Sequence, residues 1–149
     1  DIYYMLGGLC SDKARSEEAY SLAARGEFVL ASAMYYNDQP PEMMYYAAEA
    51  IRELGDGAEA DRRFGMFIDY ANEHMDDEIK IDYFAVSLPD FLIFEADLDK
   101  KNKVHCCSMG ALGCLGRGDK EGARAYAEKG LALDKCHAVL LDVMKRVNE

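Results

Sequence analysis

The sequence lacks every feature that would mark a membrane protein, an exported protein or a recognisable class of enzyme. It contains no run of about 20 apolar residues, the length that a helix needs to span a bilayer. It has no basic stretch followed by an apolar one, the pattern of a signal peptide. No catalytic signature occurs anywhere, and strand-like alternation is nearly absent. The chain is therefore expected to be helical, to bind no membrane and to carry no catalytic residues of its own.

What the chain does contain is enough apolar material for one folded domain. Its 149 residues are sufficient to bury a core, and half of them are hydrophobic, which argues against disorder. The sequence begins at Asp1 and not at methionine, so we expect a fragment of a longer protein. Whether that longer protein is an enzyme stays open.

Basic residues are scarce in the first two thirds of the chain. Residues 1–99 hold 7 Lys and Arg against 22 Asp and Glu, whereas residues 100–149 hold 10 against 6. The net charge of −11 predicts repulsion from nucleic acid and from anionic lipid, so neither is expected as a partner. The asymmetry is suited to orienting a partner or a second copy of the chain, as in a homodimer. The alternative is that these charged helical faces are simply solvated.

Disulfide and metal-binding spacings are missing as well. The five cysteines form no disulfide framework and no CxxC pair, which predicts reduced thiols and a cytoplasmic location. Cys107 and Cys114 fall on an apolar helical stripe, so they are expected to be small core residues. A Cys–His nucleophile would need an exposed thiol, and only His105 and Cys106 are candidates for that. No metal or cofactor is expected, although soft ligands gather in one region: His105, Cys106, Cys107, Cys114, Cys136 and His137.

Helical periodicity punctuated by glycine and proline fills the chain. Ser11 or Asp12 is expected to begin a helix, while Gly26 and Gly55 are expected to end helices. The pattern predicts three antiparallel hairpins, a further short helix, an irregular insert and a closing helix. The hairpins are expected near 1–26, 40–76 and 102–134. The short helix is expected at 27–36, the insert at 77–101 and the closing helix at 136–148.

Acidic residues are concentrated between Asp69 and Asp99, where Lys80 is the one basic residue. A calcium loop would need a central glycine and a terminal glutamate, and this stretch has no such arrangement. No carboxylate pair for glycoside hydrolysis can be identified either. We expect Asp77 or Asp90 to cap short helices and the other acids to face water.

The stretch YYNDQPPEMMYY, residues 35–46, is predicted to join two helices. Pro40 favours an extended step before it, and Pro41 suits the first turn of the next helix. Neighbouring residues on a helix point about 100° apart, so one tyrosine of a pair can pack while the other faces outward. We expect Tyr45 to contact a partner and Tyr46 to pack.

Small residues recur at matching positions in the three hairpins. Each second helix carries an alanine anchor, with another small residue twelve positions upstream and a small or apolar one nine upstream. Small side chains let paired helices approach closely. The three columns are Gly7, Ala48 and Ala111, then Cys10, Ile51 and Cys114, then the anchors Ala19, Ala60 and Ala123.

On these residues the chain resembles the tetratricopeptide repeat (TPR) family. The best-kept stretches are YYAAEAIRELGDGAEADRRF and MGALGCLGRGDKEGARAYAEKGLALD, with Lys135 where the family usually has proline. The anchors lie 41 and 63 residues apart, not at the regular TPR spacing of about 34. The resemblance implies an irregular all-α superhelix, or solenoid, of antiparallel helix hairpins. It would comprise about three repeats and a degenerate insert in a single domain, 1–149.

Three further stretches narrow the resemblance: YYNDQPPEMMYY, DYFAVSLPD and LDKKNKVHC. They are similar to the C-terminal helical-repeat region of large bacterial proteins whose N-terminal domain resembles carbohydrate-active β-sandwiches. This implies a non-catalytic scaffold that mediates protein–protein or interdomain interaction. The alternative is a helical accessory segment of a carbohydrate-active enzyme that contributes to its substrate cleft.

The TPR resemblance also implies which residues would meet a partner. In that family the inner face of the first helix of each repeat lines a groove. Tyr45, Glu49 and Arg52 are spaced i, i+4 and i+7, so they share one helical face. The expected occupant is a protein, a peptide or the missing N-terminal domain of the same chain. The groove candidates are Tyr4, Tyr45, Glu49, Arg52, His105, Ser108 and Leu112.

Overall fold

The computed structural model describes residues 1–32, 38–79 and 97–149. In these ranges it contains helices and no strand, which confirms the predicted all-α class. None of the described helices has both the length and the hydropathy needed to cross a bilayer. The helices are α1 (Ile2–Leu9), α2 (Lys13–Ala23), α3 (Pro41–Glu53), α4 (Gly57–His74), α5 (Leu98–Gly116), α6 (Lys120–Leu133) and α7 (Ala138–Asn148).

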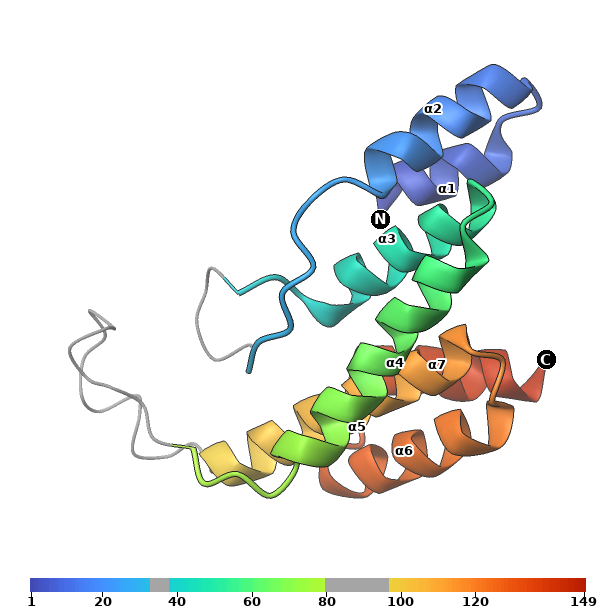
Figure 1. The fold of residues 1–149 in the computed structure, drawn as a ribbon. Helices are drawn as coiled ribbons and strands as arrows, with labels where there is room; N and C mark the ends of the chain where they lie inside the picture. Colours follow the sequence, from blue (N-terminus) through green and yellow to red (C-terminus); the bar gives the residue numbers. More distant parts are fainter. Residues whose placement is uncertain (33–37, 80–96) are drawn as a thin grey trace, which may run out of the picture.

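Each helix packs against the next one along the chain, so helices that are adjacent in sequence are also adjacent in space. The odd-numbered helices also contact one another in order, α1 with α3, α3 with α5 and α5 with α7. Figure 1 shows the α1–α2 hairpin at one end of the molecule and α5, α6 and α7 at the other. The helix α5 starts earlier than the expected 102, and most of the expected insert, 80–96, lies outside the described residues.

Aspartate side chains begin most of the helices. Asp12, Asp56, Asp97 and Asp119 are N-caps, and each carboxylate accepts a hydrogen bond from the backbone N–H three residues further on. These bonds satisfy amides that a helix N-terminus leaves without partners, and the negative charge suits the helix dipole there. Part of the acidity of the chain therefore serves local structure, as predicted for Asp12.

Another acidic residue has a different role from the expected one. Asp77 caps no described helix, and its carboxylate lies 2.7 Å from Nδ1 of His74 instead. The cap in this region is Asp97, because α5 begins at the residue that follows it. The other expected cap, Asp90, lies outside the described residues.

The two prolines begin the following helix as predicted, although no helix precedes them in the described residues 27–32. Pro40 is non-helical, with φ −60° and ψ 138°, and α3 begins at Pro41. Proline is tolerated at that position because the first amides of a helix have no intrahelical acceptor. The tyrosine pair at positions 35–36 lies outside the described residues.

The predicted helix at 27–36 is wrong over its described part, since residues 27–32 are not helical. Gly26 has φ +114°, a left-handed conformation that carries the chain away from α2. Phe28 and Leu30 then pack against the core, while Val29 between them is exposed. The sequence Phe-Val-Leu therefore alternates between core and solvent, a period of two that a helix does not provide.

Two turns of the fold share one construction. Gly55 and Gly118 have φ of +99° and +75°, values that favour glycine. The amides of the aspartates that follow, Asp56 and Asp119, donate back to carbonyls in the last turns of α3 and α5. Each of these aspartates then caps the next helix with its side chain. A single Gly-Asp pair thus ends one helix and begins another.

The core is centred on α5, which packs against α3, α4, α6 and α7. Phe64 and Phe67 of α4 are fully buried. Glycines on α5 make this contact close, because a β-carbon at Gly113 would lie 2.7 Å from the carbonyl oxygen of Phe64. A β-carbon at Gly116 would meet the Phe64 ring itself. Close approach of α4 and α5 therefore depends on missing side chains.

Candidate functional site

Most of the residues predicted to meet a partner lie on α3 and α5. These two helices and α7 line a small open hollow. Its volume is about 220 Å³, below the range of about 300–1,000 Å³ that is usual for small-molecule sites. It therefore suits one inserted side chain better than a cofactor. The lining residues are Glu42, Tyr45, Tyr46, Leu112, Ala138, Val139, Asp142 and Arg146.

One side of the hollow is held by a contact between distant parts of the chain. Arg146 of α7 donates from Nη2 to the Tyr45 hydroxyl of α3 at 3.0 Å. Its guanidinium also lies 5.3 Å from the Tyr45 ring centroid, and Nη1 lies 3.8 Å from Asp142 Oδ2. The arginine is thus occupied by a hydrogen bond, a cation–π contact and an ion pair. The contribution of α7 to the site was absent from the sequence prediction.

Of the two tyrosines of α3, Tyr46 packs against the core as predicted, but Tyr45, which was predicted to face a partner, is buried. Tyr45 is 2% exposed and packs against Phe64, with 5.5 Å between ring centroids, whereas Tyr46 is only partly buried. The apolar stripe of α3 indicates that Tyr45 is the more buried of the two tyrosines. Met44 and Ala48 are buried, and Tyr45 is closer to them around the helix than Tyr46 is. Burial raises the pKa of the Tyr45 phenol, and the nearby charge of Glu49 raises it further.

Tyr4 and Glu49, two further predicted groove residues, lie beside this pair and do not line the hollow. The Tyr4 ring is 5.3 Å from that of Tyr46, which connects α1 to α3. Burial raises the pKa of Tyr4 to about 12, with smaller contributions from nearby charges that include Glu49. Burial also raises the pKa of Glu49, although the Arg52 guanidinium 3.3 Å away opposes that shift.

Arg52 is engaged inside the chain. Its Nη2 donates to Asp61 Oδ1 at 2.9 Å and to the carbonyl oxygen of Gly116 at 2.5 Å. The guanidinium lies 4.9 Å from the ring centroid of Phe64. Arg52 therefore links α3 to α4 and to the end of α5.

The candidates on α5 divide into a buried pair and an internally bonded histidine. Ser108 and Leu112 are buried, and of these two Leu112 lines the hollow. His105 Nε2 donates to the carbonyl oxygen of Ala31 at 2.8 Å, since a carbonyl can only accept. Burial lowers the pKa of His105, and the Ala31 carbonyl opposes that shift in part. His105 thus holds the segment 27–32 against α5.

The one candidate for a Cys–His nucleophile, His105 with Cys106, lacks the exposed thiol that it would need, because Cys106 is fully buried. Burial raises the pKa of Cys106 to about 12, so the thiol stays protonated near neutral pH. Cys107 and Cys114 are buried in the core cluster, as predicted. In the part of the chain that the structure describes, no three His, Cys, Asp or Glu side chains are grouped as metal ligands would be.

No protein-family model matches the chain, and no solved structure matches its fold. Roles for the residues around the hollow therefore follow from their own geometry.

Proposed function

We propose that the chain is a non-catalytic, TPR-like scaffold that mediates protein–protein or interdomain interaction through the hollow between α3, α5 and α7. The observation that carries the proposal is that these three helices lie far apart in sequence yet line one recess. A partner that inserts a side chain there would contact all three helices at once. Such a shared surface is characteristic of helical-repeat binding modules.

The packing supports a TPR-like solenoid. Each helix contacts its sequence neighbour, and the odd-numbered helices contact one another in order, as expected when hairpins are stacked. The small-residue columns lie where helices meet, since Ala48, Ala60, Ala111 and Ala123 are all fully buried. Small side chains at such crossings allow short distances between helix axes.

The lining of the hollow indicates what kind of segment would fit. Leu112 and Val139 give it an apolar wall, while Glu42 and Asp142 place carboxylates among its lining residues. The one cation there, Arg146, is already bonded to Tyr45. We therefore expect an apolar side chain next to a lysine or arginine. The net charge of −11 would also steer a basic partner toward the chain.

A matched pair of variants on α7 tests this proposal. Ala138 and Leu141 are both exposed, but only Ala138 lines the hollow. Short linear peptides that carry leucine or methionine beside a basic residue would be selected against the wild-type chain, and their affinity measured by calorimetry. Ala138→Lys should weaken binding about tenfold, or about 1.4 kcal/mol, by repelling the basic residue and narrowing the recess. Leu141→Lys should leave the affinity within about twofold.

Other outcomes are equally informative. If no peptide of this class binds, or if both variants weaken binding equally, the hollow is not the docking site. If soluble oligosaccharides bind at the hollow and peptides do not, the result would support the alternative role in a carbohydrate-active enzyme.

A further inference from the structure

The first helix carries an apolar surface that the fold does not cover. Of the large apolar side chains that are exposed in the described residues, more than half belong to α1. Elsewhere such residues occur singly, a distribution that needs no explanation. Gly7 is the one buried residue of α1. The exposed large apolar side chains of α1 are Ile2, Tyr3, Met5, Leu6 and Leu9.

Four of these residues form a continuous stripe, which we call the α1 stripe: Ile2, Met5, Leu6 and Leu9. Their spacing of i, i+3, i+4 and i+7 places them on one face of the helix. The opposite face holds Gly7, whose backbone lies under the ring of Tyr20 from α2. The α1 stripe contains no charged residue, although the chain as a whole is acidic. It is therefore an uncharged apolar strip on the side of α1 away from Gly7, and its Leu6 also borders α2.

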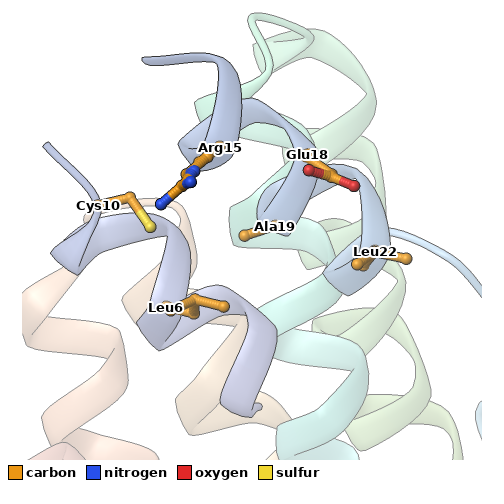
Figure 2. A pocket seen from close by; sticks show the side chains of 6 residues that line it. All are labelled: Leu6, Cys10, Arg15, Glu18, Ala19 and Leu22. Carbon is orange, nitrogen blue, oxygen red and sulfur yellow. The ribbon is translucent and has the colours of Figure 1, made fainter. Parts of the chain in front are cut away.

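Beside the α1 stripe lies a hollow of about 330 Å³ between α1 and α2. Leu6, Ala19 and Leu22 provide its apolar part (Figure 2). Arg15 extends toward Cys10 at one side of the hollow, and Glu18 lies at the other (Figure 2). Within the described part of the chain, Arg15 forms no ion pair with a neighbouring carboxylate. A cation thus stands unpaired at the edge of an apolar surface.

We propose that the α1 stripe is the interface of a homodimer, in which α1 of a second copy lies antiparallel on it. A two-fold axis between Met5 and Leu6 would place Ile2 opposite Leu9, and Met5 opposite Leu6. The interface would then be isologous, since each pair of residues occurs twice. An uncharged stripe suits this arrangement, because like charges would otherwise face each other.

The charges at the edge fit the same arrangement. Antiparallel pairing about this axis places Asp1 of the second copy opposite Cys10, which is the residue that Arg15 extends toward (Figure 2). Asp1 Oδ1 accepts from the amides of Tyr3 and Tyr4 in its own helix, so the carboxylate would meet the Arg15 guanidinium through its other oxygen. This contact would occur twice in the dimer. At the other end of the molecule, α7 exposes Leu141 beside Asp142 and Lys145. That mixed surface does not complement the α1 stripe, so a closed dimer is favoured over a head-to-tail chain.

The dimer should be weak and reversible. A helix of eight residues is about 12 Å long, so one such helix from each copy buries less area than the interface of a stable dimer does. Analytical ultracentrifugation from micromolar to millimolar protein should show a monomer–dimer equilibrium for the wild-type chain. A chain that stays monomeric throughout would overturn the proposal.

Variants locate the interface. Met5→Lys places two cations near the axis and should weaken dimerisation at least about tenfold. Leu141→Lys makes the same chemical change on α7 and should have no effect. Circular dichroism should show both variants folded, because both side chains are exposed. Equal weakening by the two variants, or a dimer insensitive to Met5→Lys, would place the interface elsewhere.

A second pair of variants tests the edge contact. Arg15→Glu should weaken the dimer about threefold to tenfold, because it replaces attraction to Asp1 with repulsion. Lys13→Glu makes the same charge change on α2, where Lys13 faces Glu17 of its own chain, and should have little effect. If the two changes act alike, only net charge matters and the proposed pairing is incorrect. Peptide binding between α3, α5 and α7 should be unchanged in Met5→Lys, which separates this proposal from the proposed function.

Discussion

The helices α1 and α5 are each the first member of a hairpin, yet their burial differs sharply. The sequence of α1, IYYMLGGL, has no charged residue, but only Gly7 is buried. The helix α5 has three lysines near its start, and it buries even Asn102 and Ser108. The difference lies in the neighbours, because α5 packs against α3, α4, α6 and α7, whereas the main neighbours of α1 among the described helices are α2 and α3. Position in the stack decides burial more than the hydropathy of the helix does.

Both hairpins nevertheless share one packing device. A β-carbon at Gly7 would lie 2.6 Å from the Tyr20 ring, and one at Gly110 would lie 2.6 Å from the Tyr126 ring. In each case a tyrosine from the second helix covers a glycine of the first. The contact within the hairpins is therefore alike, and what differs is the cover on the outer face.

The largest expected effect comes from removing a core ring. Phe67→Ala should lower the free energy of unfolding by about 3–5 kcal/mol, because this α4 side chain is fully buried against α5 and Phe28. Leu9→Ala on α1 should change it by less than about 0.5 kcal/mol. Urea unfolding of both variants measures this. Similar losses would mean that α1 is as well packed as α4.

The next largest difference between α1 and α5 should come from replacing a glycine of each helix by alanine. The two changes should shift the free energy of unfolding in opposite directions. Gly113→Ala should cost about 2–3 kcal/mol, since its β-carbon would press on the backbone of α4. Gly8→Ala should stabilise the chain by about 0.5–1 kcal/mol, because the nearest atom would be 3.7 Å away and alanine favours helix. Thermal unfolding, with matched urea titrations, gives both values. The comparison fails if Gly113→Ala is neutral.

Arg52 offers a smaller test on polar contacts. Arg52→Met keeps the length of the side chain but removes the donors to Asp61 and to the Gly116 carbonyl. A loss of about 1–2 kcal/mol in unfolding free energy is expected. Lys13→Met removes an exposed pair with Glu17 on α2 and should cost less than about 0.5 kcal/mol. Equal losses would show that Arg52 is only a surface group.

The smallest effect concerns pH. The pKa of His105 is lowered by burial in the folded chain, so the unfolded chain takes up its proton first on acidification. Stability from this group is complete above the ordinary histidine value of about 6.5 and is lost as pH falls below it. His105→Gln keeps a donor for Ala31 but cannot titrate in this range. The unfolding free energy of the wild type should therefore fall more steeply between about pH 7 and pH 5 than that of the variant. Parallel curves would contradict the lowered pKa.

Sequence patterns predicted the local structure well and the site poorly. Periodicity, Asp12, Gly55 and the prolines define helices and their ends, because caps and turns depend on neighbouring residues. The contact between Tyr45 and Arg146 joins residues 101 apart, and no local pattern specifies it. The internal contacts of Arg52 could not be predicted for a related reason, since its acceptor on Gly116 belongs to another hairpin.

The Gly-Asp turns have a consequence for how the chain can change length. Because Asp56 completes the end of α3 and also caps α4, there is no spare residue between these helices. An added residue would detach the cap from one helix or the other, and it would turn the apolar face of α4 by about 100°. The same holds for Asp119 between α5 and α6. Insertions and deletions within these two turns should therefore destabilise the hairpins, because they change the register of the second helix against the first.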